Sequence, residues 1–488
     1  MQLRAAACAL MLLAVATACT GNDSSFPPPP EGGPFEWADF GSSGRVQTGH
    51  LEVPLDYGDP SKGTVDLFVA RHVADPSKRI GSLLVNPGGP GFGGTDFAVH
   101  AAKIYDKALL DRFDIIGWDP RGTGLSTPAI DCTDDYDRFY ANLDITPDDT
   151  AERQALIDAA KEFADDCATK NAAILPYVGT NNSARDMDRI RQTLGEPKIS
   201  YFGFSYGSEL GATWATLFPT TVRAAVLDGA VDPTADQLQD SLQQTRGFEQ
   251  ALDTFLAQCS AKSKCKFHND GNAAAAYDAL MSQLDASPLP SADGRPPVNL
   301  MVATSGVNQA MYSDTFWPQL AEALHAAQGG DGSGLLALYD MYYGRNDDGT
   351  YPNSLEAFQA IVCMDTAERV TVAQDDAAAA EVRAAGPRVT PGTTGSYFCT
   401  FFPAADDPRV TITGKGAGPI LVMGTTGDSA TPLDGTRAMA DTLEDGRLVI
   451  VTANQHTGYA VNKCASKTVD EYLIDPVGHV PADGTECT

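Results

Sequence analysis

Short runs of consecutive apolar residues recur along the chain and predict strands buried in a parallel sheet. The predicted buried strands are residues 81–85, 113–118, 199–204, 224–227, 419–423 and 447–451. Stretches with helical periodicity lie between several of them, for example residues 151–168 and 183–194. Alternation of strands and helices is typical of an α/β fold, so we predict a mostly parallel central sheet.

Two segments depart from this alternation. Residues 49–72 contain two strand-like stretches around a turn with Pro and Gly, which predicts an antiparallel hairpin. Residues 234–394 are rich in Ala, Gln and Asp, and their amphipathic segments favour helices. Those segments are residues 240–261, 273–284 and 315–327. We therefore predict a core formed by residues 36–233 and 395–488, interrupted by a helical cap over residues 234–394.

The N-terminal segment predicts export from the cell. A short basic stretch precedes an apolar run over residues 5–16, which is too short to span a bilayer, and small residues precede Cys19. We interpret residues 1–18 as a signal peptide, Cys19 as a lipidation site and residues 19–35 as a tether. Secretion with ordinary cleavage near Ala18 is the alternative. We expect an extracellular protein, held by its lipid at the outer face of a bacterial cell membrane.

The remaining cysteines fit an oxidising compartment. Cys8 lies in the predicted signal peptide, and the eight cysteines after Cys19 fall into pairs of sequence neighbours. Pairing of neighbours is the simplest of many possible patterns. It gives the bridges Cys132–Cys167, Cys259–Cys265, Cys363–Cys399 and Cys464–Cys487. A zinc site would need clustered cysteines with C-x-x-C spacing, which the sequence lacks, so we expect no metal.

Composition excludes further classes of function. The 488 residues include 34 Lys and Arg against 64 Asp and Glu, which gives a formal net charge of −30. A nucleic-acid-binding protein needs a basic surface, and an acidic surface disfavours direct docking on anionic lipid. The glycine-rich segment over residues 86–91 carries no G-x-x-x-x-G-K-[ST] motif for cradling a phosphate. We therefore expect no nucleic-acid partner, no cofactor, and membrane contact only through the lipid anchor.

A serine flanked by glycines directly follows one predicted strand. Residues 203–207, Gly-Phe-Ser-Tyr-Gly, match G-x-S-x-G and precede a helical pattern over residues 208–217. A sharp strand-to-helix turn of this kind exposes a nucleophilic serine, although a Gly/Ser turn could also arise by chance. We interpret Ser205 as the nucleophile and the Tyr206 amide as one donor to the transition-state oxyanion.

Chain order selects the partners of this serine. The nucleophile needs a histidine base oriented by a carboxylate, and in this type of fold they follow in the order Ser, Asp, His. His456 lies just past the last predicted buried strand, whereas His479 lies in a Pro- and Gly-containing tail. Asp428 follows the strand over residues 419–423, at the sheet edge where α/β folds place catalytic groups. We therefore predict Asp428 and His456 as the acid and the base.

A second oxyanion donor is expected from the glycine-rich segment over residues 86–91, which follows the first predicted parallel strand. Consecutive glycines let the backbone approach a substrate closely and direct its amides. Gly89 is the preferred donor and Gly88 the alternative.

Five motifs together resemble the secreted tripeptidyl aminopeptidases, which are α/β-hydrolase serine peptidases related to the prolyl aminopeptidases. They are residues 53–57, 86–91, 119–126, 203–207 and 227–233. Residues 426–432 and 456–459 are similar to the C-terminal part of the same family. The resemblance implies an α/β-hydrolase fold, a Ser205–Asp428–His456 triad, and release of tripeptides, other short peptides or single residues from free N-termini.

An exopeptidase of this kind must bind a substrate ammonium, which calls for carboxylates near the cleft. The candidates are Glu209, Asp232 and Asp365, and Glu209 stands where we expect a neutral residue in most relatives. Arg121 is expected to brace a loop near the site. Two alternatives stay open, because a fold does not fix a function. One is a carboxylic-ester hydrolase on the same scaffold, and the other is a binding lipoprotein without catalytic activity.

Overall fold

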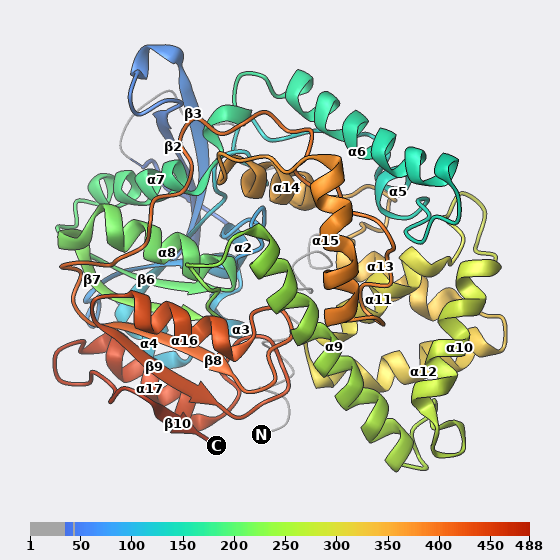
Figure 1. The fold of residues 1–488 in the computed structure, drawn as a ribbon. Helices are drawn as coiled ribbons and strands as arrows, with labels where there is room; N and C mark the ends of the chain where they lie inside the picture. The colour runs from blue at the N-terminus through green and yellow to red at the C-terminus, as the bar shows by residue number, and fades with distance from the viewer. Residues whose placement is uncertain (1–34, 42–43) are drawn as a thin grey trace.

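The computed structural model describes residues 35–41 and 44–488 (Figure 1). The predicted signal peptide, the lipidation site Cys19 and nearly all of the predicted tether lie outside these residues. Within the described ranges, no helix has the length and apolar character needed to cross a membrane.

A ten-stranded sheet forms the centre of the fold, in the order β1-β2-β3-β5-β4-β6-β7-β8-β9-β10. The strands are β1 (Ala38–Asp39), β2 (Val46–Pro54), β3 (Thr64–His72), β4 (Gly81–Asn86), β5 (Phe113–Trp118), β6 (Ile199–Phe204), β7 (Val222–Asp228), β8 (Ile420–Thr425), β9 (Gly446–Val451) and β10 (Thr485–Cys487). Strands β2 and β3 form the predicted antiparallel hairpin, and all neighbours from β5 through β10 pair in parallel. The prediction of a mostly parallel α/β sheet is therefore confirmed.

Helices cover both faces of the sheet, which is why β4, β5, β6 and β8 are buried at every position. The helices of the first half are α2 (Thr95–Val99), α3 (Ala101–Ile104), α4 (Lys107–Arg112), α5 (Tyr136–Tyr140), α6 (Thr150–Lys170), α7 (Thr180–Thr193) and α8 (Tyr206–Leu217), and the last two are α16 (Leu433–Thr442) and α17 (Lys463–Ile474). One apolar core joins α7, α8 and α16 to the sheet, and a second joins α2, α3, α4 and α17 to its other face (Figure 1).

The stretch between β7 and β8 is mostly helical. Its helices are α9 (Gln237–Ala261), α10 (Ala273–Ala286), α11 (Leu300–Met311), α12 (Trp317–Gln328), α13 (Ser333–Tyr343), α14 (Ser354–Met364) and α15 (Val372–Ala385). Short 3-10 turns are η1 (Pro60–Lys62), η2 (Leu175–Tyr177), η3 (Pro219–Thr221), η4 (Asn269–Gly271) and η5 (Asp314–Phe316). Helices α9 to α13 share a third apolar core, whereas Ala357, Ala360 and Ile361 of α14 pack into the core of the sheet.

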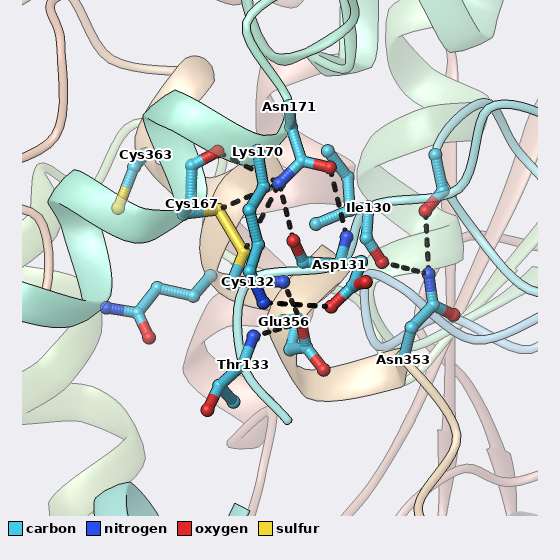
Figure 2. The surroundings of a disulfide bond; sticks show 12 residues. Ile130, Asp131, Cys132, Thr133, Cys167, Lys170, Asn171, Asn353, Glu356 and Cys363 are labelled. Atoms are coloured by element: carbon cyan, nitrogen blue, oxygen red, sulfur yellow. Dashed lines mark hydrogen bonds and ion pairs between the residues drawn. A yellow bond between two sulfur atoms is a disulfide. The ribbon is translucent and has the colours of Figure 1, made fainter. Parts of the chain in front are cut away.

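All four predicted disulfides are present, joining Cys132 to Cys167, Cys259 to Cys265, Cys363 to Cys399 and Cys464 to Cys487. The first of them holds the loop after β5 against α6 (Figure 2). Helix α14 is bound to the same loop, because the Glu356 carboxylate accepts hydrogen bonds from the backbone amides of Cys132 and Thr133. These contacts hold α14 against the loop that follows β5.

Arg121 joins three segments beneath the sheet edge. Its guanidinium donates two hydrogen bonds to the Asp186 carboxylate of α7, at 2.7 and 2.8 Å, and others to the carbonyls of Pro54 and Leu55 at the end of the hairpin. Both charged side chains are 0% exposed. Arg121 therefore acts as a buried brace, and its guanidinium is occupied by protein groups.

Replacing Asp186 with Ala should lower the free energy of unfolding by about 3–5 kcal/mol, because the Arg121 charge would remain buried without a partner. Urea denaturation measures the change. The matched control is Asp165→Ala, which removes the exposed Lys161–Asp165 pair and should cost less than about 1 kcal/mol. Equal losses in the two variants would contradict the assignment of Arg121 as a brace.

Glu356 should make stability depend on pH. Burial raises the pKa of Glu356 to about 7, despite the amide donors of Cys132 and Thr133, so the folded protein holds this proton more tightly than the unfolded chain. The stability that Glu356 contributes is present in acid and is lost as pH rises towards 7. The stability of Glu356→Gln relative to wild type should therefore be higher at pH 8 than at pH 5. The urea midpoints of the two proteins at each pH measure this difference. The exposed Glu381→Gln serves as control, and parallel curves for Glu356→Gln and wild type would refute the expectation.

Candidate active site

The turn from β6 into α8 carries Ser205 in an unusual backbone conformation. Ser205 has φ 57° and ψ −127°, a region that costs a residue with a side chain on the order of 1–3 kcal/mol. Its amide donates to the Asp228 carbonyl at 2.8 Å. A Cβ on Gly203 would lie 2.2 Å from the Gly207 carbonyl oxygen, so only glycine fits there. The predicted strand-to-helix turn is thus present, with Ser205 at its apex.

Asp428 and His456 meet in the loops that follow β8 and β9. The Nδ1 atom of His456 lies 2.9 and 3.0 Å from the two carboxylate oxygens of Asp428. His456 is 3% exposed and Asp428 is 5% exposed. The amides of Ala430, Thr431 and Thr457 donate to the same carboxylate. This geometry fixes the imidazole with Nδ1 towards the acid, which leaves Nε2 for a serine hydroxyl.

The sheet brings these loops beside the serine turn. Asp228, which accepts the Ser205 amide, is followed by Gly229, where a Cβ would lie 3.1 Å from Cε1 of His456. Ser205, Asp428 and His456 therefore follow β6, β8 and β9 at the same carboxyl edge of the parallel sheet.

Two further contacts hold His456, and no sequence pattern predicts either of them. The Thr431 hydroxyl lies 3.2 Å from Nδ1. Tyr312, between α11 and η5, accepts the His456 backbone amide at 2.8 Å and places its ring edge-on against the imidazole, with centroids 5.6 Å apart. The helical stretch thus supports the histidine directly, although Tyr312 lies far from it in the sequence.

The glycine-rich segment after β4 lies against the serine turn. A Cβ on Gly88 would be 2.4 Å from the Phe204 carbonyl oxygen and 2.9 Å from Cβ of Ser205. The Gly88 amide donates to the Asn86 side chain, whereas the Gly89 amide has no hydrogen-bond partner among the described residues. The Tyr206 amide opens α8 and has no acceptor within the helix. Gly89 and Tyr206 therefore offer the two unoccupied donors, and Gly88 does not.

A cavity of about 880 Å³ opens beside Ser205, Tyr206 and Gly89. Its walls come from α6, α9, α14, α15 and the chain after α15. Apolar side chains form much of it: Phe139, Leu143, Ile145, Leu156, Phe163, Phe358, Val362, Val382 and Val389. Its carboxylates are Glu209, Asp232, Asp236, Asp240, Asp365 and Asp375, and Arg409 is the one cation among the described lining residues. The cavity therefore combines an apolar wall with an excess of negative charge.

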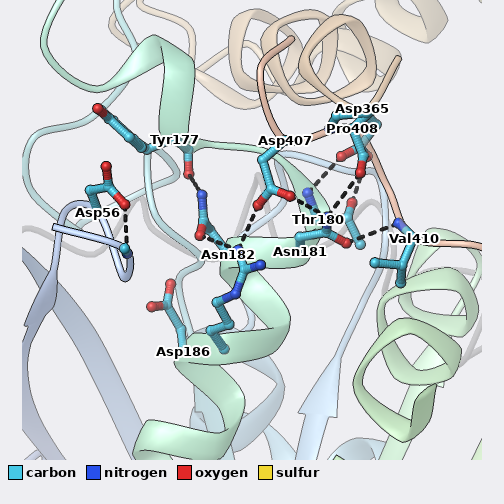
Figure 3. A network of polar contacts seen from close by, with 12 residues as sticks. Asp56, Tyr177, Thr180, Asn181, Asn182, Asp186, Asp365, Asp407, Pro408 and Val410 are labelled. Atoms are coloured by element: carbon cyan, nitrogen blue, oxygen red, sulfur yellow. Dashed lines mark hydrogen bonds and ion pairs between the residues drawn. The ribbon is translucent and has the colours of Figure 1, made fainter. Parts of the chain in front are cut away.

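The three predicted ammonium-binding carboxylates all line this cavity, but their surroundings differ. Glu209 forms an ion pair with Arg409, which neutralises its charge. Asp365 accepts the amide and hydroxyl of Thr180, each at 2.6 Å, and burial raises its pKa to about 7 (Figure 3). Burial alone would also raise the pKa of Asp232, but hydrogen bonds from Thr234 and Gln243 outweigh it and hold that pKa below its usual value. Of these three carboxylates, Asp232 is the one held anionic with no cationic partner among the described residues.

The segment that carries Arg409 is fixed to α7. The Asn181 side-chain amide donates to the Asp407 carboxylate and the Pro408 carbonyl, and its oxygen accepts the Val410 amide (Figure 3). Arg409, which the sequence analysis did not single out, is thereby held over Glu209. Within the part of the chain that the structure describes, no cluster of three or more His, Cys, Asp or Glu side chains could hold a metal ion.

Comparison with known proteins agrees with this geometry. The profile of the α/β-hydrolase fold family matches residues 81–463. The serine protease Hip1 of Mycobacterium tuberculosis is 34% identical, over 96% of this chain and 93% of the relative. A protein of the same organism named carboxylesterase B is 35% identical, over 90% and 85% of the two chains. The tripeptidyl aminopeptidase of Streptomyces lividans is 30% identical, over 92% and 85%.

These relatives span nearly the whole described chain, and the fold family covers the strands that carry Ser205, Asp428 and His456. The resemblance to the tripeptidyl aminopeptidases is thereby confirmed at the level of the family. The chain belongs to the α/β-hydrolase family, in the group of serine peptidases that includes the tripeptidyl aminopeptidases.

Proposed function

We propose that this serine hydrolase is an extracellular exopeptidase that releases short peptides, tripeptides foremost, from free N-termini. The observation that carries the proposal is the excess of carboxylates in the cavity beside Ser205, because an exopeptidase must bind the substrate ammonium. Similarity to a tripeptidyl aminopeptidase supports the same substrate class. The four disulfides fit an extracellular location, and lipidation at Cys19 remains part of the proposal.

The chemistry follows from the geometry of the site. Ser205 attacks the scissile carbonyl while His456 takes its proton through Nε2, and Asp428 stabilises the imidazolium that forms. The amides of Gly89 and Tyr206 stabilise the oxyanion of the tetrahedral intermediate. His456 then protonates the leaving amine, and a water molecule hydrolyses the acyl-enzyme by the same route.

Asp232 is the carboxylate that we propose to hold the substrate ammonium. It is anionic at neutral pH, it is partly exposed at the cavity, and its hydrogen-bond donors are neutral groups. Oδ1 already accepts two hydrogen bonds from Thr234, whereas Oδ2 accepts one from Gln243 and keeps a lone pair for a further donor. Glu209 is already paired with Arg409, and Asp365 is turned towards Thr180, so both are poorer acceptors.

Ester hydrolysis is the second candidate function. The apolar wall of the cavity would suit the acyl chain of an ester, and one relative is named carboxylesterase B. The acyl-enzyme mechanism serves both reactions, so the substrate decides between them.

The first test compares a tripeptide p-nitroanilide with a free amine and its N-acetylated form. We expect kcat/KM to be at least about tenfold higher for the free amine, because one charge-assisted hydrogen bond is worth on the order of 1.5–3 kcal/mol. Ser205→Ala should abolish both activities by several orders of magnitude. Equal cleavage of both peptides would refute ammonium recognition. Cleavage of p-nitrophenyl esters alone would establish the esterase instead.

The second test replaces Asp232 with Asn. We expect KM for the free-amine peptide to rise about 10- to 100-fold, with little change for the acetylated peptide, because only the former presents an ammonium. The matched control is Asp75→Asn, since Asp75 accepts the amide and hydroxyl of Ser77 in the same local turn but lies outside the cavity. A change of equal size for both peptides would exclude Asp232 as the ammonium acceptor.

A further inference from the structure

Asp228 connects the serine turn to the histidine loop. It is the last residue of β7, and its side chain is fully buried. Its backbone carbonyl accepts the Ser205 amide at 2.8 Å. Its carboxylate accepts the Gly458 amide at 2.7 Å through Oδ1 and the Tyr459 amide at 2.8 Å through Oδ2. One residue thus binds both segments that must meet for proton transfer.

The histidine loop needs such support because its backbone is strained. Thr457, next to His456, has φ 70°, and Ala460 has φ 62°, in the left-handed region that residues with side chains rarely adopt. Asp428 accepts the Thr457 amide, and Asp228 accepts the next two amides along the chain. Three successive amides after His456 are therefore held by two buried carboxylates.

Asp228 also acts on His456 through its charge. Burial raises the pKa of Asp228 to about 7, although the hydrogen bonds from the Gly458 and Tyr459 amides lower it. Among the charged groups, His456 lowers the pKa of Asp228 and Asp428 raises it. The ionised form of Asp228 favours a positive charge on His456 during proton transfer. Asp228 is fully buried and is not among the residues that line the cavity.

We propose that Asp228 is a second carboxylate of the catalytic centre, a positioning residue that sets His456 relative to Ser205 and stabilises the imidazolium together with Asp428. The proposal rests on the serine-hydrolase mechanism of the proposed function, and it holds for peptide and ester substrates alike.

Asp470 provides a matched control. It is also a buried aspartate, with a pKa raised to about 7 by burial, and it contacts the same Tyr459 through the phenol hydroxyl at 2.9 Å. It lies on α17 and has no contact with Ser205 or His456 in the described structure. Asp470→Asn therefore makes the same chemical change at similar burial, away from the proton-transfer groups.

The experiment measures kcat, KM and pH profiles for Asp228→Asn and Asp470→Asn with the p-nitroanilide and with a p-nitrophenyl ester. We expect Asp228→Asn to lower kcat by about 10- to 100-fold, since small displacements of catalytic groups have effects of this size. KM should stay within about twofold, because Asp228 is outside the cavity. The acid limb of kcat/KM should move to lower pH, since a negative charge near His456 is lost. Asp470→Asn should retain the wild-type kcat and profile.

The rate of serine phosphorylation by diisopropyl fluorophosphate separates this proposal from the proposed substrate class. In that reaction Ser205 Oγ gives its proton to His456 and bonds to phosphorus while fluoride leaves, so the serine and histidine are tested without any peptide. A slower rate in Asp228→Asn, with wild type reacting normally, supports the proposal even if no free-amine peptide is cleaved. A rate equal to wild type would overturn it.

A purely structural role predicts different results. A loss of kcat in Asp228→Asn without movement of the acid limb, or an equal loss of kcat in Asp470→Asn, would overturn the proposal. If Asp228→Asn does not fold, as thermal unfolding would show, Asp228→Glu takes its place. Glu keeps the charge but displaces the carboxylate, so kcat should fall while the acid limb stays in place, and a wild-type kcat in this variant would overturn the proposal.

Discussion

Ser205 adopts a backbone conformation that a residue with a side chain rarely occupies, and the arrangement of the site depends on keeping it there. The turn is possible because glycines on either side let two strands and a helix approach to contact distance. Gly88 of the loop after β4 fits against the same turn, so the oxyanion donors and the nucleophile are positioned by one set of close backbone contacts. The strain at Ser205 is balanced by the hydrogen bond of its amide to the end of β7.

The parallel pairing of the strands also determines where Asp428 and His456 lie. Because β6, β7, β8 and β9 run side by side in the same direction, their carboxyl ends lie at one edge, where β7 ends at Asp228 and the segments after β6, β8 and β9 carry Ser205, Asp428 and His456. Buried carboxylates in these loops accept backbone amides rather than lysine or arginine side chains. The loops are therefore fixed without cations that would compete with the imidazolium.

The helical stretch between β7 and β8 supports His456 and forms part of the cavity wall. Tyr312 holds the backbone of His456, and α14 is attached to the loop after β5 through Glu356. The cavity lies between this stretch, α6 and the sheet edge, so its shape depends on segments from distant parts of the chain. Its charge is uneven because Arg409 neutralises Glu209, while Asp232 has no cationic partner in the part of the chain that the structure describes.

Local pattern in the sequence was sufficient for the strands, the hairpin, the G-x-S-x-G turn and the order of Ser205, Asp428 and His456, because each depends on periodicity, glycine placement or chain order. Neighbouring cysteines also gave all four disulfides. The sequence could not show that Tyr312 supports His456, that Arg409 pairs with Glu209, or that the Gly88 amide is already occupied. Such contacts join residues far apart in the chain, and only the packing of the helices over the sheet edge decides which of them meet.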